Sequence, residues 1–398
     1  MSKLKTAEPK APRSKSEDVF HEIMSGTPVR IGLSVLLGFI VGAIFMALFN
    51  QDVVATYSTF TSNPGLTFQT AGQTILDGYG ALLRGSIFNP SGRDLVAMVR
   101  PITETLRLAA PLIMAGLGVA LGFRVGLFNV GGTGQLVMGL LGATWISTRV
   151  ELPWGVHMLL AVIVAVIFAA AWGAIVGVLK ARTGAHEVIV TIMLNYVALN
   201  LYTWFLREPT LLLEHGGGGT PKSDPPALTA QLPTLLGSEF KLHIGIIFAA
   251  IALYVYWWLM ERSTIGYRFK MVGHNSFAAR AAGISVERTY VWALAASAAF
   301  MGLAAANQGL GESGGLTSSI HANIGFDAIT VALLGGSRTR GVLFAGLLFG
   351  AFKAGGATMQ VAGVSPQILG VVQALIVLFV AAPPVIRAIF RLPVKEAK

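Results

Sequence analysis

The sequence is a succession of apolar runs, most of them close to the length that crosses a lipid bilayer, separated by polar segments from residue 29 to residue 382. A helix needs about 20 apolar residues to span the hydrocarbon core, which is about 30 Å thick. Only 12 % of the residues are charged, against about a quarter in soluble domains. The sequence therefore predicts an all-α, polytopic membrane protein.

Lys and Arg are concentrated in the polar segments that connect alternate runs. Cytoplasmic loops of membrane proteins carry an excess of these residues, so the basic segments mark the cytoplasmic side. Ten crossings satisfy this pattern and place both termini in the cytoplasm. The run at 323–336 has only about a dozen apolar residues, which leaves open whether it crosses with the help of its flanks or re-enters. The expected crossings are residues 29–49, 95–121, 130–147, 155–179, 186–206, 242–260, 289–310, 323–336, 342–360 and 368–382.

One membrane domain is expected between two polar tails. Residues 1–28 are basic, punctuated by proline and without an apolar period, which is typical of a disordered cytoplasmic tail. The net charge of +10 is spread over tails and loops rather than one face, so nucleic acid is not an expected partner. The expected parts are the tail 1–28, the membrane domain 29–385 with an outer amphipathic helix at 74–88, an external loop at 207–240 and a basic loop at 261–288, and a cytoplasmic tail at 386–398.

Two glycine-interrupted segments break the apolar pattern. Residues 123–142, FRVGLFNVGGTGQLVMGLLG, place Asn129, Thr133 and Gln135 among glycines, and residues 324–336 read IGFDAITVALLGG. Irregular polar chain survives at membrane depth only where it lines a cavity or is buried in protein. A pair of such segments in corresponding halves of a transporter points to a solute site near the midplane. The alternatives are a polar cytoplasmic turn, and glycines that serve only close helix packing.

Charged residues also occur within the run at 95–121. Arg100, Glu104 and Arg107 are spaced i, i+4 and i+7, so they share one helical face. They form either an interfacial ladder whose side chains extend outward to water or a polar wall of a solute path.

Motifs of the main enzyme classes are absent from the sequence. There is no GxxxxGK[ST] phosphate loop, no GxSxG nucleophile elbow, no cysteine, and no metal-ligand spacing among the seven histidines. The GxGxxG match at 309–314 follows an apolar run rather than a strand, so it does not indicate a dinucleotide site. We therefore expect no catalytic residues, no bound metal and no cofactor on this chain.

Four segments that occur in order together resemble one family. They are GLGVALGFRVGLFNVGGTGQLVMG at 116–139, HEVIVTIMLNYVALNL at 186–201, STIGYRFKMVGHNSFAARAAGISV at 263–286 and GFDAITVALLGGSRTRGVLFAGLLFGAFKAGG at 325–356. They are similar to the permease subunits of bacterial ATP-binding cassette (ABC) importers for nucleosides and simple sugars. These are relatives of the ribose permease, served by binding proteins of the basic-membrane-protein type. The HEVIVTIMLNY segment resembles the nucleoside branch more than the sugar branch.

The resemblance implies a permease of the bacterial cytoplasmic membrane that works by alternating access. It implies ABC ATPase subunits that bind ATP and Mg²⁺ in place of this chain, an extracytoplasmic substrate-binding protein, surrounding membrane lipid and a second permease subunit. Because the nucleoside branch commonly pairs two different permeases, we expect a heterodimer. The basic tail at 1–28 and the glycine run at 216–219 depart from the family pattern.

The same resemblance places the helix that couples to the ATPases within the basic loop. Small residues suit a helix that sits in a partner's groove, and a glycine after them can end it. The alternative is a plain basic loop held at the lipid headgroups. The expected coupling residues are Gly273, Asn275, Ala278, Ala279, Arg280, Gly283 and Ile284.

Residues suited to a nucleoside are expected along the solute path. Amide side chains offer donors and acceptors to sugar hydroxyls and base edges, and aromatic rings can stack on a base. Each amide has the alternative role of linking helices. The competing functions are import of simple sugars such as ribose or galactose and ion-driven transport with Glu104 and Asp327 as proton carriers. The expected pathway residues are Asn129, Gln135, Asn195, Tyr196, Phe128, Gln308 and Asp327.

Overall fold

The computed structural model describes residues 27–208, 221–237, 239–311, 314–321 and 323–391. The described residues are helical, and their β pairing is limited to two isolated bridges. Most of the predicted N-terminal tail, the centre of the predicted external loop and the last seven residues lie outside this part. The helices are α2 (Thr27–Phe49), α3 (Gln51–Ala55), η1 (Thr56–Thr59), α4 (Pro64–Ser86), α5 (Leu95–Arg124), α6 (Gly132–Arg149), α7 (Val156–Thr183), α8 (Glu187–Arg207), α9 (Gly245–Arg262), α10 (Thr264–His274), α11 (Ser276–Ala281), α12 (Val286–Gly311), α13 (Ile324–Leu334), α14 (Thr339–Val361), α15 (Pro366–Ala381) and α16 (Pro383–Phe390).

All ten expected runs form helices. In the described part of the chain, seven helices are long and apolar enough to cross a membrane: α2, α5, α7, α8, α9, α12 and α14. Helices α15 and α16 form an eighth span if the 95° bend between them lies within one segment. The two remaining expected crossings are α6 and the 11-residue α13, which follow or contain the glycine-interrupted segments. The all-α, polytopic fold is confirmed, and the count of ten crossings stays a prediction.

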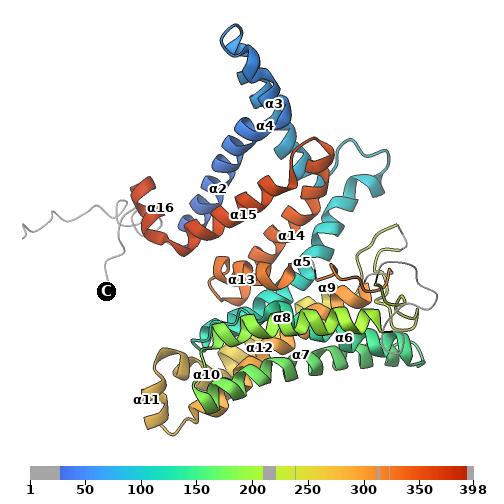
Figure 1. Ribbon diagram of the computed structural model, residues 1–398, viewed down its shortest axis with the longest axis vertical. Coiled ribbons are helices and arrows are strands. Elements are labelled where there is room, and N and C mark those ends of the chain that lie inside the picture. Colours follow the sequence, from blue (N-terminus) through green and yellow to red (C-terminus); the bar gives the residue numbers. More distant parts are fainter. Residues whose placement is uncertain (1–26, 209–220, 238, 312–313, 322, 392–398) are drawn as a thin grey trace, which may run out of the picture.

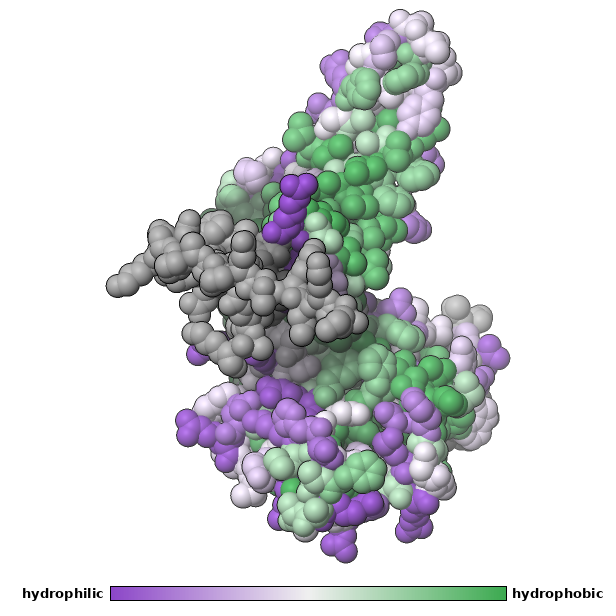
Figure 2. Space-filling model, turned by 90° about the vertical axis from the view of Figure 1, so that its left-hand side faces the viewer, coloured by the Kyte–Doolittle hydropathy of each residue, from purple (hydrophilic) through white to green (hydrophobic). Residues whose placement is uncertain are grey.

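The first helices form an arm that projects from the rest of the molecule (Figure 1). The sequence predicts a surface helix only at 74–88, but α4 is longer and its second half packs into the bundle. Gly78 lets α4 pack closely on Met46 of α2, and Gly85 lets it approach Thr358 of α14 so closely that a Cβ atom would collide. Helix α4 is therefore part of the helix bundle. The projecting arm as a whole presents a largely hydrophobic surface in Figure 2.

Helix α5 lies at the centre of the bundle, between α13 and α14 on one side and α9 and α12 on the other (Figure 1). It is buried without interruption from Ala109 to Gly122. Helices α7 and α12 pack along their length because Gly173 lies against Leu294 and Gly302 lies against Ala165. Small residues that let backbones approach closely are the usual contact between helices in a membrane.

Different contacts hold the helices together at the two ends of the bundle. At the basic end, Arg124 at the close of α5 binds Glu261 of α9 at 3.2 Å and donates from Nε to the Ser337 carbonyl at 3.1 Å. At the opposite end, which we call the loop end, Ala227 N donates to the Ser147 carbonyl at 2.8 Å. The predicted external loop thus packs on one end of the helices, and the predicted cytoplasmic connections meet at the other.

Candidate functional site

The connection between α5 and α6 holds a buried network of amide side chains. Asn129 is fully buried, and its Oδ1 accepts hydrogen bonds from Gly131 N at 3.0 Å and from Gln135 Nε2 at 3.1 Å. Its Nδ2 donates to Gln135 Oε1 at 3.1 Å and to Ser297 Oγ at 2.9 Å. Ser297 in turn donates to the Gly118 carbonyl at 2.6 Å. The non-helical segment is therefore tied to both α12 and α5.

A second amide, Asn195 of α8, completes the N-terminus of α6. The residue that precedes α6 is Gly131, which has no side chain to cap the free N–H groups of the first turn. Asn195 Oδ1 accepts from Gly134 N at 2.8 Å, and its Nδ2 donates to the Val130 carbonyl at 3.0 Å. The Asn195 side chain, from a neighbouring helix, thus accepts a backbone hydrogen bond that an N-cap residue would normally accept.

Three of the four predicted amides therefore lie together. In this conformation their polar atoms form hydrogen bonds with other groups of the protein. They link helices here, and a role in contacting a solute stays a prediction.

The remaining predicted pathway residues are dispersed. Phe128 lies near the start of α8, where its N–H donates to Glu187 Oε1 at 3.4 Å, and its ring lies 5.2 Å from that of Phe123. Tyr196 is exposed on α8, and Gln308 is half-buried on α12. Their roles stay predictions. Asp327 instead pairs with Lys353 of α14.

A cavity of about 400 Å³ lies between α4, α5 and α14 and is rich in charge. The charged face of α5 lines it, with the Glu104 carboxylate 2.9 Å from Arg107 Nε. The face borders other helices at this cavity, and Arg100 at its start is exposed, so both roles named for it stay predictions. A charged group in hydrocarbon is costly, so clustering around one cavity is the expected arrangement. The ionisable side chains that line the cavity are Arg84, Arg100, Glu104, Arg107 and Lys353.

Lys353 connects this cavity to the second glycine-interrupted segment. Its Nζ lies 2.8 Å from Oδ2 of Asp327 in the first turn of α13, and both side chains are about three-quarters buried. The sequence prediction omitted Lys353 as well as Arg84 of the same cavity. The available signal was that Lys353 is the single charged residue of the run 342–360, and such a residue is by default a functional candidate.

Two further buried polar side chains, His243 and Asn307, were not predicted from the sequence. His243, just before α9, is buried, and its Nδ1 accepts from Gly245 N at 3.2 Å. Asn307 of α12 is also buried, and its Nδ2 lies against Gly245 with no hydrogen-bond partner in the described part of the chain.

The basic loop folds into two short helices, where the prediction was one coupling helix. Asn275 caps α11 by accepting from Phe277 N and Ala278 N, both at 3.0 Å. Gly283 follows α11 with φ +81°, the left-handed geometry that commonly ends a helix. Ala279 is buried, Arg280 pairs with Glu287, and Ile284 lines a cavity beside α12.

Gly273 joins this loop to the α5–α6 connection. It lies so close to the backbone of Arg124 and Val125 that a Cβ atom would overlap the Arg124 carbonyl. Gly126, in the same connection, faces Gly273 in turn. Helix α10 therefore contacts the segment that carries the amide network directly.

Comparison with known proteins identifies the family of the chain. The family model described as the permease component of the branched-chain amino acid transport system matches residues 102–381, which is most of the chain. The chain belongs to this family of permeases. It is accordingly a multi-pass protein of the cytoplasmic membrane, and the resemblance noted in the sequence is confirmed.

Several curated proteins are similar to this permease over most of its length. The guanosine ABC transporter permease protein NupP of Bacillus subtilis is 36 % identical over 324 residues, covering 81 % of this chain and 90 % of NupP. The nucleoside ABC transporter permease protein NupB of Lactococcus lactis is 35 % identical over 288 residues, covering 71 % and 79 %. The glucose ABC transporter permease protein TsgB13 of Haloferax volcanii is 31 % identical over 364 residues, covering 89 % and 86 %. No solved structure matches the chain significantly.

Proposed function

We propose that this permease is the membrane subunit of an ABC importer that carries nucleosides. The observation that supports the substrate is the 35–36 % identity to permeases named for guanosine and nucleosides. The chemistry of the charged cavity is compatible with this class. Guanidinium forks donate to the ring nitrogen and carbonyl oxygen of a purine, and carboxylates accept from ribose hydroxyls and exocyclic amines.

Transport proceeds by alternating access in this proposal. ATP and Mg²⁺ bind to separate ATPase subunits, which dock on α10 and α11 at the basic end. The substrate-binding protein docks on the loop end. Closure of the ATPases moves α10 and α11, and the contact of Gly273 with Arg124 passes this movement to the α5–α6 connection.

The solute path lies between two permeases, and the second is a different chain. The resemblance to the nucleoside branch, which commonly pairs two different permeases, supports this assignment. Co-purification with a tagged copy tests it: a heterodimer carries an untagged relative, whereas a homodimer carries an untagged copy of this chain.

Uptake of labelled guanosine tests the function. Cells that express the complete transporter should lose uptake equally when this chain is deleted and when the P-loop lysine of the ATPase is replaced. Uptake that survives ATPase inactivation but collapses with an uncoupler would instead establish ion-driven transport. Glu104 and Asp327, the only carriers we could name for that mechanism, are each paired with a cation.

Sugar import is the second candidate, because the glucose permease TsgB13 is 31 % identical over 89 % of this chain. Competition separates the two. Excess unlabelled adenosine or uridine should reduce guanosine uptake, whereas excess glucose, galactose or ribose should leave it unchanged. Labelled sugar that enters in place of nucleoside would assign the chain to sugar transport.

A further inference from the structure

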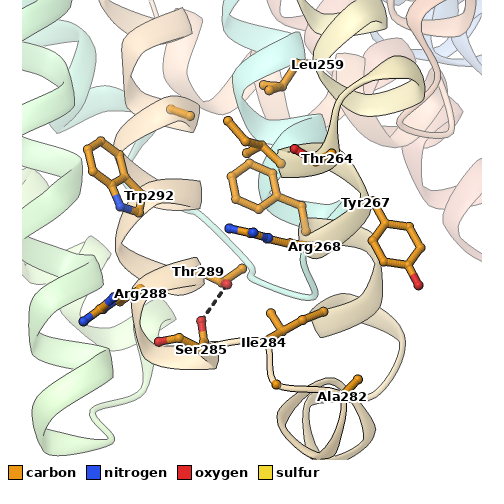
Figure 3. Close-up of a pocket in the computed structure, with 14 residues that line it drawn as sticks. Leu259, Thr264, Tyr267, Arg268, Ala282, Ile284, Ser285, Arg288, Thr289 and Trp292 are labelled. Carbon is orange, nitrogen blue, oxygen red and sulfur yellow. Dashed lines mark hydrogen bonds between the residues drawn. The ribbon is translucent and has the colours of Figure 1, made fainter.

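A second and larger cavity, of about 1010 Å³, opens at the basic end of the molecule (Figure 3). It is enclosed by the end of α9, by α10 and by the first turns of α12, away from the charged cavity of α4, α5 and α14. Leu259, Ile265 and Phe269 give it apolar walls. Its cations are Arg268, which extends from α10 toward α12, and Arg288 at the start of α12.

Neither guanidinium in this cavity has an ion-pair partner among the described residues. The acidic side chains of the same loop are engaged elsewhere, since Glu261 binds Lys270 at 2.7 Å and Glu287 binds Arg280. Both cavity arginines are exposed. Arginine presents a planar fork that matches the oxygens of a phosphate, so two arginines beside one cavity suit a phosphate-bearing ligand.

The side chains along α12 are ordered by polarity with depth. Arg288, Trp292 and Ala296 all line the cavity and are spaced four residues apart, so they share one face of the helix. At 1.5 Å per residue, the backbone of this face rises about 12 Å along the helix axis from residue 288 to residue 296. Trp292 is 69 % exposed and lies between them. The same order is found in a bilayer: charged groups lie in the headgroup layer, aromatic rings lie at the interface, and apolar groups face the acyl chains.

We propose that this cavity binds an anionic phospholipid. Its phosphate binds at the mouth of the cavity, which Arg268 and Arg288 both line, and its acyl chain extends along Trp292 toward Ala296. Basic pockets between membrane helices at the cytoplasmic side bind lipids of this class. Gly283 and Ile284 also line the cavity, so the bound lipid contacts both the α11–α12 connection and α10 and holds them together. The proposal does not depend on which solute the permease carries.

The test uses the full-length permease, purified in a mild detergent and titrated with phosphatidylglycerol or phosphatidylcholine. Native mass spectrometry counts retained lipid, and thermal unfolding reports stabilisation. We expect phosphatidylglycerol alone to be retained and to raise Tm. The double variant R268Q/R288Q should weaken its binding at least tenfold. The matched control R182Q/R340Q removes the same charge from exposed residues that do not line the cavity, and it should bind as the wild type does.

Two further measurements separate the lipid from other occupants. Ala296→Trp fills the apolar end of the cavity, so it should weaken binding of phosphatidylglycerol; inorganic phosphate should not raise Tm. Stabilisation by phosphate as large as that by the lipid would make this a free-anion site and overturn the proposal. Equal retention of phosphatidylcholine would also overturn it. The same holds if R268Q/R288Q keeps its lipid but no longer co-purifies with the ATPases, because the cavity is then an ATPase contact.

Discussion

At the scale of single residues, the amides singled out in the sequence hold the irregular segment together. Such a segment leaves backbone N–H groups without helical partners, and Asn129 and Asn195 supply acceptors for two of them. Leaving a buried polar group unsatisfied costs about 1–3 kcal/mol. The amide network therefore makes a broken segment stable inside the bundle.

Replacement of Asn129 by Asp measures this contribution. Aspartate keeps the shape and the acceptor to Gly131 N but cannot donate to Gln135 or Ser297, so we expect unfolding to be easier by about 1–3 kcal/mol and Tm to fall. Asn323→Asp is the matched control, because Asn323 is exposed before the first turn of α13 and its side chain makes no capping hydrogen bond. Equal Tm values for the two variants would contradict a stabilising role for the network.

The charged pair of α13 and α14 leads to a second prediction at this scale. Lys353→Met leaves the largely buried Asp327 carboxylate beside an apolar side chain, so uptake should fall at least tenfold. Asp327→Asn in the same chain removes the stranded charge and should recover part of the uptake. A double variant no better than K353M would show that the lysine acts on the solute rather than through Asp327. Labelled-nucleoside uptake, normalised to the amount of protein in the membrane, is the measurement.

At the scale of helices, apolar length and glycine spacing predict most elements but not their partners. Every expected run became a helix, because length and composition are local properties. Lys353 and Asp327 are 26 positions apart, and they meet only because α13 packs beside α14. The burial of α4 against α14 depends likewise on Gly85 meeting Thr358, a contact that no local pattern predicts. The charged face of α5 likewise borders α4 and α14, neighbours that the sequence of α5 alone does not predict.

Gly273→Val tests the link between the basic loop and the α5–α6 connection. Its side chain cannot fit against the Arg124 carbonyl, so α10 must move away from α5. We expect ATPase subunits still to co-purify, whereas uptake falls at least tenfold and ATP hydrolysis continues uncoupled from transport. Ala281→Val adds the same bulk to an exposed position of α11 and should transport normally. Normal coupling in G273V would refute a mechanical role for this contact.

At the scale of the whole molecule, charge is distributed along one axis. Hydrophilic side chains gather on the lower part of the face in Figure 2, which views the molecule from the side that carries α10 and α11. The described part of the external loop packs at the other end of the helices. An importer needs these ends on opposite sides of the membrane, because the ATPases and the binding protein work in different compartments.

This orientation can be measured directly because the chain contains no cysteine. Phe277 at the tip of α11 and Leu228 in the external loop are 81 % and 82 % exposed, so either accepts a cysteine without disturbing the core. In spheroplasts, a membrane-impermeant maleimide should label Leu228→Cys at once and Phe277→Cys only after lysis. Basic residues at the α11 end predict this result through the positive-inside rule. Labelling of Phe277→Cys in intact spheroplasts would place the basic loop outside, where no ATPase can dock, and the importer mechanism would fail with it.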